Sequence, residues 1–194
     1  MKTFNQAKRQ QGNYLLGIGI GIMIMLILAA WGIPKVKGYL VEGAIPSVAE
    51  EIQRFVSRVK VSSQGAGTTP YTGLTQAYFA RAVKGSSLEV GAVSGQGTGS
   101  SVVRHGLGGG DTGLVTLSTT GATFALQFDD VSDSACPGLA AALQRNFDAI
   151  TINATAVKAT DANNVVTQAY IAGSAAASCV DGDNNQFVFT VNRN

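Results

Sequence analysis

Charged and aromatic residues are scarce in this 194-residue chain. Only 13% of the residues are charged and the formal net charge is +2, so we expect no surface for nucleic acid. Aromatic residues make up 7% of the chain, whereas glycine, alanine, serine and threonine are abundant. This composition favours short strands and turns over a long helical bundle. The length allows one modest globular domain with a terminal segment.

Histidine, on which many metal and acid–base sites depend, is nearly missing. His105 is the single histidine, so the sequence offers no zinc constellation. It lies in the segment VRHGLGGGD, whose glycines match neither a Walker loop nor a dinucleotide fingerprint, and we expect an exposed turn there. No serine or cysteine has a recognisable general base. We therefore predict that the protein is not an enzyme and uses no cofactor.

Cysteine is equally scarce, with one pair, Cys136 and Cys179. An even pair in a chain with an export-like amino terminus indicates a disulfide, and the alternative is two buried thiols in a cytosolic domain. A disulfide would close a loop of about 44 residues. On the chain-entropy model, this cross-link would stabilise the fold by roughly 4 kcal/mol.

One acidic segment offers oxygen ligands for a cation. Asp181, Asp183 and Asn185 have the i, i+2, i+4 spacing with which an EF-hand loop begins, but the turn glycine and the closing glutamate are missing. These residues are a candidate for calcium. The alternative, which we favour, is a polar hairpin turn without a metal.

A long apolar run follows Gly12. The 22 residues from Asn13 to Pro34 carry no charge. A helix of this length is long enough to cross a hydrocarbon core of about 30 Å. Basic residues before the run favour an amino terminus on the cytoplasmic side. The run could be a signal peptide cut at Ala30-Trp31-Gly32, a plain membrane anchor, or a helix retained after a cut on its amino-terminal side. A conventional signal peptide has a shorter apolar core, and here a helical pattern continues beyond the run.

That pattern is an apolar stripe from Val36 to Val59 with a spacing of three or four residues. Glu50 and Glu51 precede Arg54 at distances that allow ion pairs on the solvent face. The sequence therefore predicts a helix about 45 residues long, apolar on all sides in its first half and amphipathic in its second.

Pro46 lies inside this stripe. Because proline lacks an N–H and crowds the preceding turn, we expect it to bend or interrupt the helix. Ser47 and Glu50 then fit a capping box that would restart it.

Beyond residue 70 the pattern becomes mixed. We expect a short helix within 70–83, a loop over 91–110, and a helix over 132–146 with Ser134 as its cap and Pro137 in its first turn. Strands are expected over 113–118, 123–131, 149–158, 165–172 and 186–192. Antiparallel strands with helices on one face predict an α+β domain whose sheet the long helix covers.

The amino terminus, Lys8-Arg9-Gln10-Gln11-Gly12 before the apolar run, resembles that of the type IV prepilins, and the type IVb subgroup of thin conjugative and enteric adhesion pili is most similar. In that family a membrane-embedded aspartic peptidase cuts a short basic leader after a glycine, and the apolar helix is retained. The resemblance implies a scissile bond at Gly12–Asn13 and a helix-loosening proline at Pro34. It also implies a pilin-like α/β roll with a disulfide near its carboxyl end.

Two positions depart from the family pattern. Asn13 stands where the family has a bulky apolar residue, and Gly17 stands where it has a glutamate that is thought to pair with the amino terminus of a neighbouring subunit. An unpaired buried charge costs several kcal/mol, so another acceptor is needed, or the chain is a minor or divergent subunit. Gly17, Gly19 and Gly21 would permit close approach between apolar helices.

The resemblance implies a leader over 1–12, a long helix over 13–62 and a head over 63–194. It implies a structural subunit, held in the inner membrane, processed by prepilin peptidase, methylated at its new amino terminus, and drawn by inner-membrane assembly machinery into a homopolymer. The filament would be an extracellular pilus of a Gram-negative-type bacterium, serving adhesion, conjugation or aggregation. The alternatives are a minor pilin or type II secretion pseudopilin that primes assembly, and an exported or membrane-anchored binding module.

Overall fold

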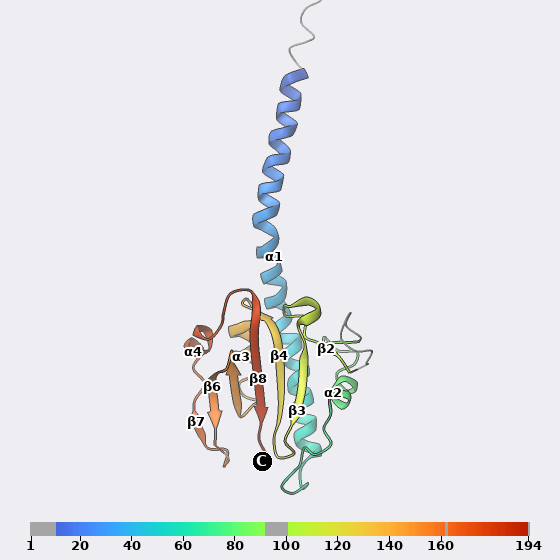
Figure 1. The fold of residues 1–194 in the computed structure, drawn as a ribbon, viewed down its shortest axis with the longest axis vertical. Coiled ribbons are helices and arrows are strands. Elements are labelled where there is room, and N and C mark those ends of the chain that lie inside the picture. Colours follow the sequence, from blue (N-terminus) through green and yellow to red (C-terminus); the bar gives the residue numbers. More distant parts are fainter. Residues whose placement is uncertain (1–10, 92–100, 162, 194) are drawn as a thin grey trace, which may run out of the picture. The chain divides into compact units, whose positions relative to one another are not determined.

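The chain consists of one long helix that continues into an α+β domain (Figure 1). The structure is a computed structural model and describes residues 11–91, 101–161 and 163–193. Helix α1 (Gln11–Ser62) extends through two compact units, whose boundary falls between Tyr39 and Leu40. The unit that begins at Leu40 is called the head here. The head in this sense includes the second half of α1, and the division of the chain after residues 12 and 62 stays a prediction.

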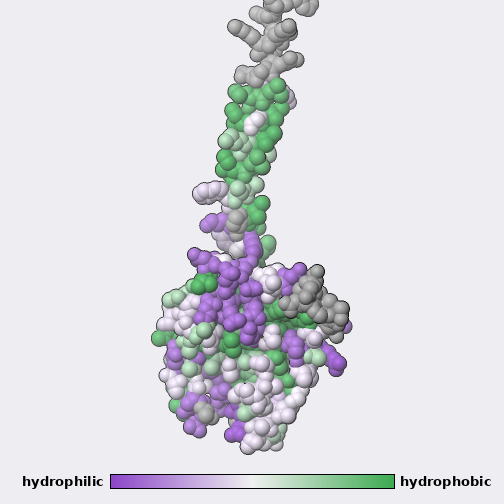
Figure 2. Space-filling model, in the orientation of Figure 1, coloured by the Kyte–Doolittle hydropathy of each residue, from purple (hydrophilic) through white to green (hydrophobic). Residues whose placement is uncertain are grey.

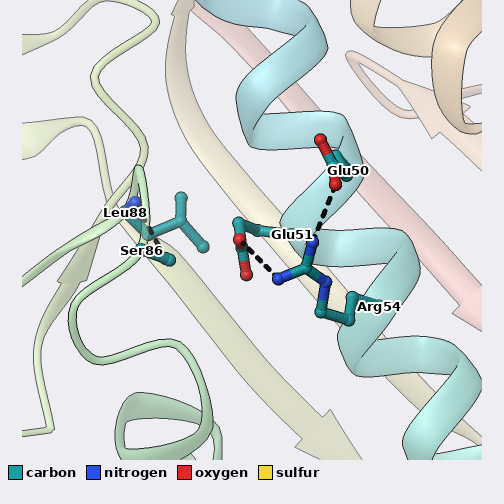
Figure 3. Close-up of polar contacts among 5 residues, drawn as sticks. All are labelled: Glu50, Glu51, Arg54, Ser86 and Leu88. Atoms are coloured by element: carbon teal, nitrogen blue, oxygen red, sulfur yellow. Dashed lines mark hydrogen bonds and ion pairs between the residues drawn. The ribbon is translucent and has the colours of Figure 1, made fainter.

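The head half of α1 buries the apolar stripe that the sequence predicts. Its buried side chains are Val41, Ile45, Val48, Ala49, Ile52, Phe55, Val56 and Val59. The predicted ion pairs are also present, because Arg54 lies 2.7 Å from Glu50 and 3.4 Å from Glu51 (Figure 3). Arg54 and Glu50 are largely exposed, so these pairs contribute only about 0.3–0.5 kcal/mol each. Burial of the stripe therefore holds this half of α1 in place.

Helix α1 is not interrupted at Pro46. The predicted capping box at Ser47 is wrong, because the Ser47 hydroxyl donates to the Ala44 carbonyl (2.9 Å) within a continuing helix. Val48 and Ile52 on the following turns are buried in the head, and this burial offsets the hydrogen bond that proline cannot make. A bend at Pro34 or Pro46 stays a prediction.

The head contains a six-stranded antiparallel sheet with the order β3-β4-β8-β5-β6-β7. Its strands are β3 (Val115–Thr119), β4 (Phe124–Ser132), β5 (Ala149–Ile152), β6 (Thr155–Thr160), β7 (Val166–Gln168) and β8 (Asp183–Val191). A separate antiparallel pair is formed by β1 (Glu89–Val90) and β2 (Val103–Arg104), and a 3-10 turn, η1 (Gly110–Thr112), precedes β3. The α+β class is confirmed. Part of the predicted 91–110 loop, residues 92–100, lies outside the described residues.

Aromatic side chains join α1 to this sheet. Phe55 of α1 packs edge-on against Phe79 and Phe124, with ring centroids 4.8 and 6.3 Å apart. Phe128 and Phe189, on the neighbouring strands β4 and β8, pack edge-on at 5.5 Å. All of these rings are buried, and aromatic rings contribute large buried areas to a core. The alternating apolar residues of β4 and β8 thus form the core face that α1 covers.

Two short helices flank α1. Helix α2 (Gln76–Ala82) confirms the predicted short helix and is capped by Thr75, whose side chain accepts from the Tyr78 N–H. Helix α3 (Cys136–Leu143) is shorter than predicted, because β4 extends to Ser132 and a turn follows it. The predicted cap at Ser134 is wrong, since the residue before the helix is Ala135, which makes no side-chain cap bond.

The predicted strand over 149–158 is wrong, because it folds into two strands, β5 and β6, joined by a two-residue turn. Asn153 and Ala154 form the turn with φ angles of 48° and 67°. The predicted strand over 165–172 is also shorter than expected, since β7 is followed by helix α4 (Ala172–Ala177). The strand pattern did not indicate the turn, because alanine rarely adopts a left-handed conformation.

Ala154→Gly is expected to raise the free energy of unfolding by about 0.5–1 kcal/mol, because glycine adopts positive φ without a steric penalty. Urea denaturation of the full chain in detergent, followed by circular dichroism, measures the change. The matched control is Ala156→Gly, in the exposed part of β6, which should lower stability by about 0.5–1 kcal/mol. Equal destabilisation by both variants would contradict the role assigned to the turn.

Candidate functional site

The part of α1 that precedes the head presents apolar side chains on the face that Figure 2 shows. Every side chain from Tyr14 to Ile33 is exposed, with Leu15 at 71%, Met25 at 73% and Trp31 at 80%. The mean hydropathy reaches 2.4 over 18 residues, and none of that window is buried. By length and composition, α1 is the one described helix that could cross a membrane.

This exposure has a large energetic consequence. Full burial of a large apolar side chain contributes about 1.5–3 kcal/mol relative to leaving it in water. Contiguous apolar patches larger than a few hundred Å² are rare on monomers and mark interaction or membrane surfaces. The segment from Tyr14 to Ile33 is therefore a candidate membrane or interaction surface.

Three glycines lie on this surface, and no other part of the described chain packs against them. A Cβ added to Gly17, Gly19 or Gly21 would meet no heavy atom within 4 Å. Small residues of this kind let apolar helices approach closely. Gly17 also means that no carboxylate stands here, and the first acidic residue of the chain is Glu42.

The predicted cleavage site lies at the beginning of the described helix. Gly12 and Asn13 belong to the first turn of α1, which starts at Gln11. Their side chains, that of Pro34, and residues 1–10 lie outside what the structure describes. Cleavage at Gly12–Asn13 therefore stays a prediction.

The predicted disulfide is present between Cys136 and Cys179. Cys136 is the first residue of α3, and Cys179 follows α4 and precedes β8. The two Cα atoms are 6.1 Å apart and the bond closes a separation of 43 residues. It ties α3 and α4 together at one end of the sheet.

His105 is buried, with 1% of its surface exposed, so the predicted exposed turn is wrong. The N–H of Leu107 donates to His105 Nδ1 (2.9 Å), and Nε2 lies 2.7 Å from the Asp129 carbonyl oxygen. Because Nδ1 accepts, the proton of the neutral ring is on Nε2, which donates to that oxygen. His105 thus ties its own loop to β4, and its ring stacks on Phe128 with centroids 5.7 Å apart.

Burial lowers the pKa of His105 below its ordinary value, and hydrogen bonding and carboxylates only partly oppose this effect. The carboxylates that act in the opposite direction are Asp129, Asp130 and Asp183. A second proton on the ring would also face the Leu107 N–H and remove its acceptor. The arrangement stabilises a neutral imidazole and uses both of its nitrogens in hydrogen bonds to the backbone.

The calcium candidate is arranged differently from a cation site. Asn185 is fully buried, and its Oδ1 accepts from the Val180 N–H (2.8 Å) and from Asn153 Nδ2 (2.9 Å). An amide oxygen has two lone pairs, so both are used within the protein. Asp183 Oδ2 accepts from the Gly109 N–H (3.2 Å), while Asp181 is exposed. Among the described residues, no group of three His, Cys, Asp or Glu side chains could hold a metal.

Gln76 is a structural residue that the sequence did not reveal. It lies at the start of α2, where its Oε1 accepts from the Leu117 N–H (2.7 Å) and its Nε2 donates to the Val115 carbonyl (2.9 Å). The amide therefore covers part of the outer edge of β3 as another strand would. No local pattern marks a glutamine for this role, because its partners are about 40 residues away.

An α+β head covered by one long helix, with an exposed apolar extension and a carboxyl-terminal disulfide, is the architecture of a pilin. The chain belongs to the PilS family: the model described as PilS N terminal matches residues 50–192, and the predicted type IVb-like pilin family is confirmed. The matched residues begin inside α1, so they do not include the segment from Tyr14 to Ile33.

A solved structure also resembles the chain. It is the crystal structure of a type IV b pilin from Salmonella typhi, with 19% sequence identity and a TM-score of 0.49 over 76% of this chain and 98% of that chain. No curated protein matches.

Replacing both cysteines, Cys136→Ala with Cys179→Ala, should lower the free energy of unfolding by up to about 4 kcal/mol, because the unfolded chain loses its cross-link. Denaturation of the detergent-solubilised chain measures this difference. The matched control is Ser178→Ala beside the bond, which should change stability by no more than about 1 kcal/mol. A reductant should destabilise the wild type and leave the double variant unchanged; a wild type insensitive to reductant would contradict the disulfide.

Folding stability should decrease as the pH falls from 7 towards 5.5. The folded pKa of His105 lies below its unfolded value, so its stabilising effect is complete above the unfolded value of about 6.5 and declines below it. His105→Gln can accept from Leu107 and donate to Asp129 without titrating, so its stability should change less over this range. The comparison uses denaturation of both chains at several pH values. Identical slopes would contradict the assignment.

Proposed function

We propose that this chain is a structural subunit of a type IVb-like pilus, polymerised through the first half of α1. The observation that carries the proposal is the apolar surface from Tyr14 to Ile33, which is exposed on a chain with a PilS-family head. A membrane can cover this surface before assembly, and the same segments of other copies can cover it afterwards. One surface thus serves both states of the subunit.

Leader removal at Gly12–Asn13 would precede the transfer of α1 from the membrane to the filament. A prepilin peptidase in the inner membrane cuts after Gly12, and the basic leader, which favours the cytoplasmic side, is released. The helix from Asn13 onward stays in the inner membrane until assembly machinery transfers it to an extracellular filament. Methylation of the new amino terminus belongs to the same processing step.

Packing between helices replaces lipid in the filament. Lipid tails are as apolar as the side chains of α1, so close packing must supply the preference for other helices. Gly17, Gly19 and Gly21 leave room for such an approach. The subunits join head to tail, because an isologous contact would stop at a dimer.

A minor pilin or secretion pseudopilin that primes assembly is the second candidate. Gly17 favours it, because an amino terminus at Asn13 would find no acidic side chain before Glu42 on the same chain. Such a subunit would occur in few copies per filament. The proportion of this chain in purified filaments separates the two candidates.

A third candidate is an exported or membrane-anchored binding module. It requires either an uncut chain or a cut after Gly32, which would remove most of the apolar surface. Its mature amino terminus would be Met1 or Ile33.

The test is amino-terminal sequencing of material that is sheared from cells and sedimented. We expect filaments in which this chain begins at Asn13. Gly12→Val should leave the leader attached and abolish filaments, because the cut follows a glycine, whereas the matched control Gln11→Ala should be processed normally. A wild-type chain that begins at Met1 or Ile33 would overturn the proposal.

A further inference from the structure

The two ends of the head can be identified from contacts along α1. Ile45 lies against Gly138 at the start of α3, Gln53 Nε2 donates to the Ala142 carbonyl (3.1 Å), and Lys60 Nζ lies 3.5 Å from the Asn146 carbonyl. Helix α3 therefore runs alongside α1 in the same direction. The first contact marks the Leu40 end of the head and the last marks its Ser62 end, where the chain's C terminus lies in Figure 1.

The Ser62 end contains a cleft of about 430 Å³. It is lined by Lys60, the loop over 63–67, Pro70, Tyr71 and Arg193. The Tyr71 hydroxyl donates to the carbonyl of Asn192, the residue that follows β8 (3.2 Å). Two cationic side chains thus lie on one concave surface.

Neither cation is neutralised within the described part of the chain. Arg193 lies 3.4 Å from the Thr68 carbonyl, and Lys60 contacts the Asn146 carbonyl; no carboxylate of the described residues lies within 4.0 Å of either. A further cation, Lys158, lies close enough to Lys60 to interact with it, and the neighbouring acid is Asp148. The cleft therefore presents two cationic side chains that form no ion pair with a carboxylate of the described residues, while Asp148 acts on Tyr71 and Asp161 lines a second hollow with Arg193.

The Leu40 end has the opposite charge. Six of the chain's twelve acidic residues lie in the turns and adjoining strand ends of this region: Asp111, Asp129, Asp130, Asp133, Asp181 and Asp183. Hydrogen bonds join these loops, because Asp133 exchanges two bonds with Gly182 and Asp183 accepts from Gly109. Figure 2 shows hydrophilic side chains gathered on the upper part of the head. Arg104 balances only Asp111 and Glu89 in this region.

We propose that, in the polymer, the Lys60–Arg193 cleft of one copy receives the acidic turn around Asp181 of the next copy. The inference rests on the proposed function and identifies the contact between the heads of neighbouring copies. A head-to-tail polymer must join two different surfaces, and two opposite ends with opposite charge meet this requirement. Two cationic ends repel each other, as do two acidic ends, so the same contact sets the direction of assembly.

Asp181 is the best-placed acidic residue for this contact. Its side chain is exposed at the tip of the turn before β8, and no hydrogen bond or ion pair of its carboxylate is present among the described residues. Asp133 and Asp183, in contrast, accept bonds that hold the loops together. Reversing Asp181 should therefore alter the contact without disturbing the head.

Charge reversal in cells tests the proposal. Lys60→Glu with Arg193→Glu should reduce the sedimentable filament at least about fivefold, since the loss of about 1 kcal/mol per contact is a factor of roughly five. Asp181→Lys should have a similar effect, and the triple variant should recover more than half of the wild-type amount. The matched control is Arg145→Glu, an exposed cation outside the cleft lining, which should assemble normally. Wild-type yields from both reversals would overturn the contact.

Zero-length carbodiimide coupling provides an independent readout. Sheared wild-type filaments should give an isopeptide bond between Lys60 and the 181–183 turn, and the subunit dispersed in detergent should give none. Lys60 and Asp181 lie at opposite ends of one head, so the bond can form only between copies. Filaments without this product would overturn the contact. A wild type without filaments would instead overturn the proposed function.

Discussion

The structure depends on how one continuous helix buries its apolar side chains. From Leu40 to Ser62, α1 buries a single stripe in the head, with Phe55 against the aromatic core of the sheet. From Tyr14 to Ile33 no part of the described chain covers it. Because α1 is one helix from Gln11 to Ser62, the covered and uncovered halves are parts of one element. The head thus provides an anchor, and the exposed half provides the surface that requires a partner.

Two buried polar side chains join loops of the head to its sheet. His105 and Asn185 are buried, and each uses both sides of its polar group to join a loop to the sheet. The disulfide joins α3 to the segment before β8 at the same end. This end therefore has its turns cross-linked by hydrogen bonds and a disulfide, and it presents exposed Asp181 to solvent. The opposite end, at Ser62, combines a cleft with Lys60 and Arg193, so the two ends differ in both shape and charge.

The sequence predicted the elements that follow simple periodicity. The stripe of α1, the alternation in β4 and β8, the ion pairs of Arg54 and the α+β class all follow from local spacing. It did not predict the turn at Asn153-Ala154, since an alanine with positive φ is tolerated only because the flanking strands pair. Nor did it predict the burial of His105, which depends on a loop that folds back on β4. Within the candidate site, the apolar helix could be predicted from a local run of residues. The charged ends of the head could not, because the fold brings together residues that are distant in sequence, such as Lys60 and Arg193.

The central claim is that other copies of α1 bury the segment from Tyr14 to Ile33 in the assembled state. Trp31 reports on this segment directly, because it is the single tryptophan of the chain and is 80% exposed in the isolated subunit. The most direct measurement is its fluorescence in sheared filaments that are free of lipid and detergent. The account predicts a blue-shifted emission that aqueous iodide does not quench. A red-shifted emission that iodide quenches freely would contradict it.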